Sequence, residues 1–327
     1  MLSKLHFASY PCQELIGILN LTRRKKIALV LTVIILIIGG VLYMLADRYL
    51  IEHVEVDVAA KTPAVAQADS NAATEQVEQD DWNYSSADTQ IHIEKVESGS
   101  GSDKVTYFVA DVQFADASLL QSAFAKNAFG RNITEDTSAI AAKNNAIFAI
   151  NGDYYGFRDD GVIIRGGTLY RDEPARDALA LLSNGTIKSY NEEQLTSSEL
   201  LAEGVTDTYS FGPILVKDGV IAGDFDKVVI DTNFGNRSIQ GSNPRTGIGM
   251  IAPNHYVFVV VDGRKDNYSK GMTLSEFASV FTELGASVAY NLDGGGSSTM
   301  YFMGRVVNNP LGKQQERGVS DIIYIAE

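Results

Sequence analysis

The chain has 327 residues, of which 27 are basic and 41 acidic, so its formal net charge is −14. Apolar residues make up 45% and charged residues 21%, a composition ordinary for a globular protein that excludes disorder throughout the chain. The acidic balance argues against a nucleic acid as partner, because nucleic-acid binding requires a basic surface. Cys12 is the single cysteine, which excludes an internal disulfide and a multi-cysteine metal site.

Residues 27–46 form an uncharged apolar run that is long enough to cross the hydrocarbon core of a bilayer as a helix. Four basic residues precede it, so the positive-inside rule places the leader, residues 1–26, in the cytoplasm. A cleaved signal peptide is the alternative, but residues 44–46 lack the small-x-small pattern of a cleavage site. We therefore expect a single-pass signal anchor in the cell membrane, with the rest of the chain outside the cell.

The segment after the anchor differs in composition from the rest of the chain. From residue 57 to about 87 it is rich in Ala, Gln, Asp, Glu, Ser and Thr, with almost no aliphatic clustering. Such a composition is typical of a flexible segment that buries little apolar surface. We therefore predict a flexible acidic stem over 47–87 and a folded domain over 88–327.

Within 88–327, short apolar runs alternate with turn signals, as in strands joined by hairpins. The predicted hairpins pair 178–182 with 186–190, 214–217 with 220–221, 246–251 with 256–261, and 300–303 with 305–307. Further strands are predicted over 105–112, 146–150, 162–164, 287–292 and 322–325. The pattern indicates a single α+β domain, with a mixed, mainly antiparallel sheet and interspersed helices.

One helix has clear start and stop signals. Thr273 and Glu276 have the spacing of a capping box, apolar residues follow at helical spacing up to Leu284, and Gly285 is placed to end the helix. Shorter helices are predicted over 118–126 and 138–144.

The most informative segment follows the strand predicted over 287–292 and reads Asp-Gly-Gly-Gly-Ser-Ser-Thr. Three consecutive glycines allow positive φ angles and let main-chain amides approach an anion. Asp293 adds a carboxylate at the end of a buried strand, although a flexible loop is the alternative interpretation. The residues expected to bind a ligand here are Asn291, Gly294, Gly295, Gly296, Ser297 and Ser298.

This segment does not fit two familiar catalytic motifs. No lysine follows the glycines as in a phosphate-binding P-loop, and no Gly-x-Ser-x-Gly nucleophile motif occurs here. A Ser-His-Asp triad would need a histidine, and the domain contains only His92 and His255, both typical of surface positions.

Other polar segments also follow predicted strands. In the segment that begins with Asn151, Asp153 offers a carboxylate, and Tyr154 and Tyr155 either form a stacking platform for a sugar or face the core. Three arginines, Arg245, Arg264 and Arg317, also lie near strand ends. A guanidinium can bind phosphate or carboxylate in a bidentate manner, although a single arginine is more often part of a surface salt bridge.

Taken in order, these motifs resemble the phosphodiester glycosidase family over roughly residues 107–327. The resemblance rests on Asn-Gly-Asp-Tyr-Tyr from residue 151, Phe-Gly-Pro from 211, Asn-Pro-Arg-Thr-Gly-Ile-Gly from 243, Val-Asp-Gly-Arg from 261, Asn-Leu-Asp-Gly-Gly-Gly-Ser-Ser-Thr-Met from 291, and residues 317–321. It implies hydrolysis of a sugar-1-phosphodiester at the glycosidic bond. Bacterial members are often linked to exopolysaccharide biosynthesis, so a cell-surface glycopolymer is the expected substrate.

The implied chemistry assigns roles to these residues. A phosphate leaving group needs little protonation, so the glycine amides, the serines and the three arginines would stabilise its charge. A carboxylate would stabilise the sugar cation or activate water. Asp293 and Asp262 are the candidates, with Glu316 and Asp321 in reserve, and nucleophile and base are not distinguished. No cofactor is established by these residues; Ca²⁺ held by spare carboxylates is left open, and no metal ligands are assigned.

Two other functions fit the same residues. A non-catalytic module for exopolysaccharide assembly could bind an anionic glycopolymer through the aromatic and arginine side chains. A glycopolymer phosphotransferase would instead pass the group to an acceptor other than water.

Overall fold

The computed structural model describes residues 22–58, 77–230 and 238–326. The chain divides into two compact units, residues 1–51 and 52–327. The first contains helix α2 (Arg23–Tyr49), which has no buried residue and is long and apolar enough to be a membrane span or a signal sequence. Most of the predicted leader, 1–21, and part of the predicted stem, 59–76, lie outside the described residues.

Strands lie at both ends of the segment predicted as a flexible stem. They are β1 (His53–Asp57), β2 (Glu78–Gln79) and β3 (Asn83–Ser85), and they pair with strands of the second unit or with each other. Tyr84 of β3 is buried, and the Trp82 ring stacks on Phe108 with centroids 6.4 Å apart. An average composition over thirty residues does not reveal two aromatic side chains that pack against the domain. Because Trp82 and Tyr84 pack in this way, the folded unit begins before residue 88.

We predict that a chain beginning at residue 88 is less stable than one beginning at residue 77. The two differ by β2 and β3, and loss of buried aromatic side chains costs about 3 kcal/mol in folding free energy. Denaturant unfolding of both chains measures the difference. Equal midpoints and slopes would show that Trp82 and Tyr84 contribute nothing to the fold.

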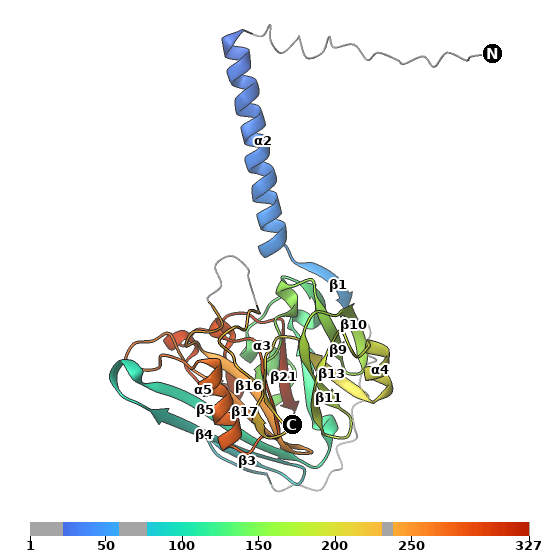
Figure 1. Ribbon diagram of the computed structural model, residues 1–327, viewed down its shortest axis with the longest axis vertical. Coiled ribbons are helices and arrows are strands. Elements are labelled where there is room, and N and C mark those ends of the chain that lie inside the picture. Colours follow the sequence, from blue (N-terminus) through green and yellow to red (C-terminus); the bar gives the residue numbers. More distant parts are fainter. Residues whose placement is uncertain (1–21, 59–76, 231–237, 327) are drawn as a thin grey trace, which may run out of the picture. The chain divides into compact units, whose positions relative to one another are not determined.

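The second unit is built on a nine-stranded antiparallel sheet among the described residues. Figure 1 shows its long strands β4, β5, β16 and β17 running together. The strands, in order of adjacency, are β15 (Val220–Ile221), β14 (Ile214–Lys217), β18 (Val288–Asn291), β16 (Arg245–Ala252), β17 (His255–Val261), β5 (Val105–Phe114), β4 (Thr89–Ser98), β3 and β2.

A second antiparallel sheet of five strands contains the C-terminal strand. Its strands, in order of adjacency, are β20 (Arg305–Val306), β19 (Met300–Phe302), β8 (Ala146–Asn151), β21 (Asp321–Ala326) and β6 (Leu120–Phe124). Apart from the hairpin of β19 and β20, neighbours in this sheet come from distant parts of the chain, so its assembly depends on long-range contacts.

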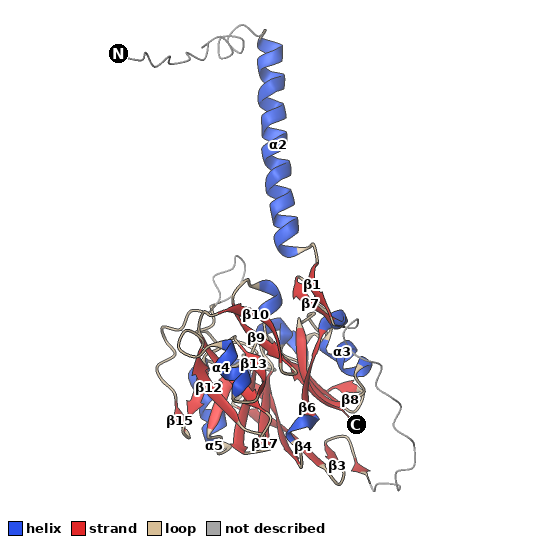
Figure 2. Ribbon diagram, turned by 90° about the vertical axis from the view of Figure 1, so that its right-hand side faces the viewer, coloured by secondary structure: helices blue, strands red, loops and turns tan. Residues whose placement is uncertain are grey.

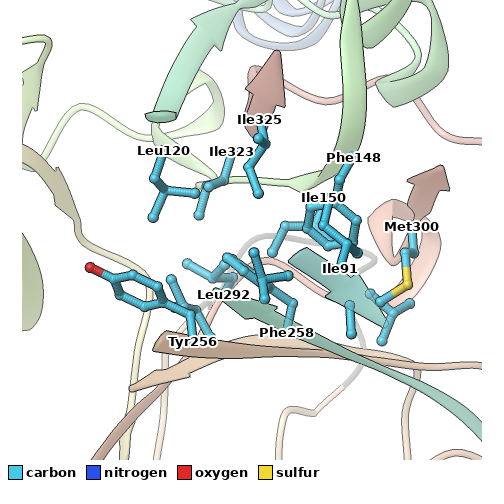
Figure 3. Packing of buried hydrophobic residues seen from close by; sticks show 14 of the residues in the cluster. Ile91, Leu120, Phe148, Ile150, Tyr256, Phe258, Leu292, Met300, Ile323 and Ile325 are labelled. Atoms are coloured by element: carbon cyan, nitrogen blue, oxygen red, sulfur yellow. The ribbon is translucent and has the colours of Figure 1, made fainter. Parts of the chain in front are cut away.

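The main hydrophobic core lies between these two sheets. Figure 3 shows Leu120, Phe148 and Ile323 of the five-stranded sheet facing Tyr256 and Phe258 of the nine-stranded sheet. Apolar residues on successive strands supply both faces, and their removal from water stabilises the packed sheets.

Strand β17 is buried on both faces, which explains its continuous apolar sequence. Phe258 and Val260 pack in the core between the sheets, whereas Val257, Val259 and Val261 pack on the opposite face. That face is covered by α5 (Leu274–Glu283), which carries the predicted Thr273–Glu276 capping box (Figure 1).

The remaining elements extend these layers. Helix α3 (Thr137–Lys143) covers the outer face of the five-stranded sheet. A three-stranded sheet consists of β12 (Ile187–Asn191), β11 (Asp177–Leu182) and β13 (Val205–Tyr209). Two further sheets of the described residues have two strands each. One is the hairpin of β9 (Gly161–Arg165) and β10 (Thr168–Glu173), and the other pairs β1 with β7 (Ala128–Arg131). Helix α4 (Ser197–Ala202) precedes β13. As Figure 2 shows, strands predominate in this unit, and the prediction of an α+β domain with mainly antiparallel sheet is confirmed.

The predicted helix over 118–126 is wrong, because the central part of this segment is strand β6. Leu120 and Phe124 are buried on one side, and β6 pairs along β21. Positions i and i+4 share a face both in a helix and in a strand, so two apolar residues at this spacing do not distinguish the two. The main chain of β21 provides hydrogen-bonding partners along its edge, and this pairing makes the segment a strand.

Candidate active site

One pocket, of about 220 Å³, lies where strands of the nine-stranded sheet end. The antiparallel pairing of β16 with β18 brings the start of β16, at Arg245, to the same edge as the end of β18, at Asn291. The pocket is lined by Tyr154, Phe211, Ile230, Ile239, Asn243, Pro244, Arg245, Arg264, Asn291, Leu292, Asp293, Gly294, Gly295 and Arg317.

Asp293 is the single carboxylate among the described residues that line this pocket. Its side chain is nearly buried, with the residue 6% exposed. Oδ1 accepts from the amide of Gly294 at 2.8 Å, and Oδ2 accepts from the hydroxyl of Ser297 at 2.6 Å. Burial raises the pKa of Asp293 above its ordinary value, whereas the Arg317 charge and the Ser297 hydroxyl oppose the increase.

Arg317 and Ser297 complete a small network around this carboxylate. Nη2 of Arg317 lies 3.0 Å from Oδ2 of Asp293 and 2.5 Å from Oγ of Ser297, and Nε donates to the same hydroxyl at 3.1 Å. The Arg317 side chain is 44% exposed, so the guanidinium remains in contact with solvent while it orients Asp293.

The glycine run provides close packing more than a set of free amides. A Cβ at Gly294 would lie 2.8 Å from the carbonyl oxygen of Pro244, so no larger residue fits without displacement of the main chain. The amide of Gly294 is bound by Asp293, that of Gly295 by Pro244, and that of Ser297 by Gly294. These three amides are therefore already hydrogen-bonded within the protein, and the prediction that the amides of this segment converge on an anion is wrong for them. Gly296 packs against Arg317, and the hydroxyl of Ser298 is buried without a partner among the described residues.

Asn151 holds the segment that follows β18. It ends β8, and its Nδ2 donates to the carbonyl oxygen of Asp293 at 2.7 Å. Its Oδ1 accepts from the Thr246 hydroxyl at 2.7 Å and from the Thr299 amide at 3.2 Å. Asn151 thus ties the ends of the two sheets to the segment after β18, and it does not line the pocket.

Arg245 and Arg264 both reach the pocket, but their side chains differ in burial. Arg245 is 3% exposed; its Nε donates to Met272, and its Nη2 donates to Ile239 and Gly241. Burial and the neighbouring Arg264 charge lower the pKa of Arg245 to about 10. Arg264 is exposed, and its Nη2 donates to Oδ1 of Asn243 at 2.9 Å beside Gly295. Arg264 and Arg317 therefore place two exposed guanidinium groups at the mouth of the pocket.

Asp262, the second candidate for the catalytic carboxylate, does not line the pocket. It is 1% exposed, and burial raises the pKa of its carboxyl group. Its two oxygens accept from the Tyr268 hydroxyl at 2.7 Å, from Nδ2 of Asn308 at 2.8 Å and from the Asn309 amide. These contacts tie three chain segments together, so its position is that of a structural residue.

Asp153 and Tyr155 also lie away from the pocket. The two oxygens of Asp153 accept from the amides of Tyr154 and Ser210, each at 2.6 Å. Tyr155 donates to the carbonyl oxygen of Ser320 at 2.9 Å and stacks on Phe129 in the core. The aromatic wall of the pocket comes from Tyr154 and Phe211 instead.

Neither reserve carboxylate lines the pocket. Asp321 is fully buried against Arg165, which donates to its Oδ2 from Nε and Nη2 at 2.9 and 2.6 Å. Glu316 accepts from the main chain and hydroxyl of Ser138, at the start of α3.

The sequence interpretation missed Arg158. It is 9% exposed, and its guanidinium carbon lies 5.2 Å from the centre of the Tyr154 ring and 5.1 Å from that of Phe211. Its three side-chain nitrogens have no hydrogen-bond partner among the described residues. A buried positive charge thus stands behind the aromatic wall, where it also opposes the rise in the pKa of Asp293. The spacing of four residues between Tyr154 and Arg158 is the one sequence signal that could have indicated a role for Arg158.

No group of three or more His, Cys, Asp or Glu side chains in the described parts of the chain is arranged to hold a metal ion. No residue is therefore assigned to the Ca²⁺ ion considered from the sequence.

We predict that Arg317→Gln shifts the acidic limb of the pH–rate profile to higher pH. The Arg317 charge lowers the pKa of Asp293, so its removal lets burial raise that pKa further. If the ionised carboxylate is the active form, activity is then lost at a higher pH as the pH falls. The pH dependence of kcat/KM measures this shift, with Arg131→Gln, on a partly exposed salt bridge, as control. An unchanged limb would contradict the role of the pair.

Comparison with known proteins agrees with this architecture. The sequence model of the phosphodiester glycosidase family matches residues 144–326. The SPbeta prophage-derived uncharacterized protein YomE of Bacillus subtilis (strain 168) is 30% identical over 207 residues, which cover 61% of this chain and 30% of that protein. The chain thus spans less than a third of the length of this curated relative.

Two solved structures show the same fold at low sequence identity. The catalytic domain of zebrafish N-acetylglucosamine-1-phosphodiester alpha-N-acetylglucosaminidase, auto-inhibited by its pro-peptide, aligns with a TM-score of 0.59 and 19% identity, over 78% of this chain and 89% of that chain. A hypothetical protein from Synechocystis aligns with a TM-score of 0.53 and 16% identity, over 78% of this chain and 64% of that one. The chain belongs to the phosphodiester glycosidase family.

Proposed function

We propose that this protein hydrolyses the glycosidic bond of sugar-1-phosphodiesters, on glycopolymers at the cell surface, while α2 anchors it in the cell membrane. Family membership supports the reaction class, and the length and apolar composition of α2 support the anchor. The observation that carries the proposal is one pocket that combines a nearly buried carboxylate with exposed guanidinium groups at its mouth.

The charges in the pocket suit this reaction. Cleavage of the bond between the anomeric carbon and oxygen leaves a phosphate monoester, which departs as an anion without a strong general acid. Arg264 and Arg317 would stabilise that anion at the mouth of the pocket. A second carboxylate, which a glycosidase uses to protonate an alcohol leaving group, is then unnecessary.

Asp293 is the residue that we assign to the sugar. The anomeric carbon becomes positively charged as the bond breaks, and a carboxylate beside it stabilises that charge or activates the attacking water. Tyr154 and Phe211 would contact the apolar face of the sugar ring, since both line the pocket. Asn151 and Ser297 hold Asp293 in place.

The test is an analysis of products from the methyl phosphodiester of N-acetylglucosamine 1-phosphate. We expect free sugar and methyl phosphate in equal amounts after incubation with the full chain in detergent. Sugar 1-phosphate as the product would show cleavage at phosphorus, and a new phosphodiester formed with an added acceptor would show a phosphotransferase. Binding without any product would favour a non-catalytic glycopolymer-binding module.

The orientation in the membrane is tested separately. We expect protease added to intact cells to cleave the second unit and leave a tag on the N-terminus protected. Cleavage of the tag alone would contradict an extracellular domain.

A further inference from the structure

Asn291 has a hydrogen-bonding atom without a partner at the pocket. Its Nδ2 donates to the carbonyl oxygen of Gly212 at 2.7 Å. A carbonyl oxygen accepts and cannot donate, so this bond fixes which end of the amide is nitrogen and which is oxygen. Oδ1 has no hydrogen-bond partner within the described ranges, although Asn291 is only 1% exposed.

An unpaired buried acceptor is unfavourable. A carbonyl oxygen that loses its water without gaining a replacement hydrogen bond destabilises the folded chain. Asn291 lines the same pocket as Asp293, so a ligand in that pocket can supply the missing donor. Because the acceptor is neutral and cannot donate, the matching ligand group is an O–H or N–H, and a phosphate oxygen does not qualify.

The position of Asn291 relative to Asp293 indicates which part of the ligand this is. Leu292, between them, packs in the hydrophobic core (Figure 3). Asn291 and Asp293 both line the pocket and lie two residues apart in the chain, so their side chains can contact neighbouring substituents of one sugar ring.

We propose that Oδ1 of Asn291 accepts a hydrogen bond from the substituent on C2 of the sugar, either a hydroxyl or an acetamido N–H. The inference rests on the proposed function, in which Asp293 acts at the neighbouring anomeric carbon. A hydrogen bond at C2 strengthens as the anomeric carbon becomes positive, because that charge makes the C2 donor more acidic. The pocket thereby selects sugars that carry a donor at C2.

Binding measurements test the inference without turnover. Glucose 1-phosphate and N-acetylglucosamine 1-phosphate carry a donor at C2, and 2-deoxyglucose 1-phosphate does not. By calorimetry on the full chain in detergent, we expect at least one of the first two to bind about tenfold more tightly than the third, the effect of one satisfied buried acceptor. Equal affinities for all three, or binding of none, would overturn the inference.

A variant assigns the discrimination to this residue. Asn291→Leu keeps the approximate size of the side chain and removes the acceptor. The ratio of the affinities for sugars with and without the C2 donor should therefore fall to about one. A full preference in the variant would overturn the assignment. If the leucine variant does not fold, Asn291→Ala makes the same comparison, because it removes the amide without adding bulk or another acceptor.

The rates separate this inference from the proposed function. For the methyl phosphodiesters of the same sugars, we take the ratio of kcat/KM for the substrate with the C2 donor to kcat/KM for the substrate without it. The ratio for the wild type is divided by the ratio for the variant, which cancels the difference in intrinsic reactivity between the two substrates. We expect a quotient of about ten or more. Discrimination in binding without any hydrolysis would contradict the proposed function and leave the inference standing. Hydrolysis with a quotient of one would do the reverse.

Discussion

Asp293→Asn is expected to reduce hydrolysis of a sugar-1-phosphodiester by roughly 10²–10⁴-fold, the range for loss of a positioned acid–base group. Asparagine keeps the size of the side chain and can still accept from the Gly294 amide. It removes the negative charge that would stabilise the sugar cation or activate water. Because Asp293 is nearly buried and lies in the pocket, no neighbouring carboxylate among the described lining residues can replace it.

The matched control is Asp266→Asn, which makes the same chemical change at an exposed position. Both variants should have melting temperatures close to that of the wild type, and kcat/KM of the control should not change. Wild-type activity of Asp293→Asn at unchanged stability would remove this residue from the reaction.

Asp321→Asn is expected to have the largest effect on stability, a loss of about 3–5 kcal/mol. Arg165 is 5% exposed and directs two nitrogens at one oxygen of Asp321. Asparagine leaves this guanidinium without a counter-charge and can turn an amide N–H toward it. The other oxygen of Asp321 also accepts from the Asp153 amide at 2.7 Å, so the damage would extend to the segment that carries Tyr154.

Denaturant unfolding of Asp321→Asn measures this loss, with Asp116→Asn, at an exposed turn, as the comparison. A stable variant with selectively reduced kcat would return Asp321 to the catalytic candidates. An equal loss in both variants would show that the buried pair with Arg165 is not the cause.

Local signals in the sequence predicted much of the fold. The α5 capping box at Thr273 and the hairpin predicted between 246–251 and 256–261 depend on neighbouring residues alone, and both occur as expected. Strand β6 shows the limit, since the pattern of Leu120 and Phe124 fits a helix and a strand equally well. Its conformation depends on β21, which lies some two hundred residues later in the chain.

The candidate site was predictable in part for a related reason. Strand-end position identified Asp293, Arg264 and Arg317, which the pocket brings together. Asp262 has the same local pattern, a carboxylate at the end of a buried strand, but the Asn308 and Asn309 contacts that occupy it come from a distant segment. No local rule states which of two such carboxylates faces a pocket.

The two adjacent tyrosines show the same limit at the aromatic wall. Tyr154 lines the pocket, whereas Tyr155 enters the core beside Phe129. They are adjacent residues of the same type, and the distinction arises because the ring of Tyr155 stacks on Phe129 and its hydroxyl donates to the Ser320 carbonyl oxygen. Residue type alone could not divide the pair.

The most direct test of hydrolysis at the glycosidic bond is the fate of the water oxygen. The methyl phosphodiester of N-acetylglucosamine 1-phosphate is incubated with the full chain in water enriched in ¹⁸O, and the phosphate products are analysed by mass spectrometry. Cleavage between the anomeric carbon and oxygen with Asp293 in the pocket predicts methyl phosphate without ¹⁸O, and almost none of it from Asp293→Asn. A label on phosphorus, in methyl phosphate or in sugar-phosphate products, would show attack at phosphorus and contradict the account.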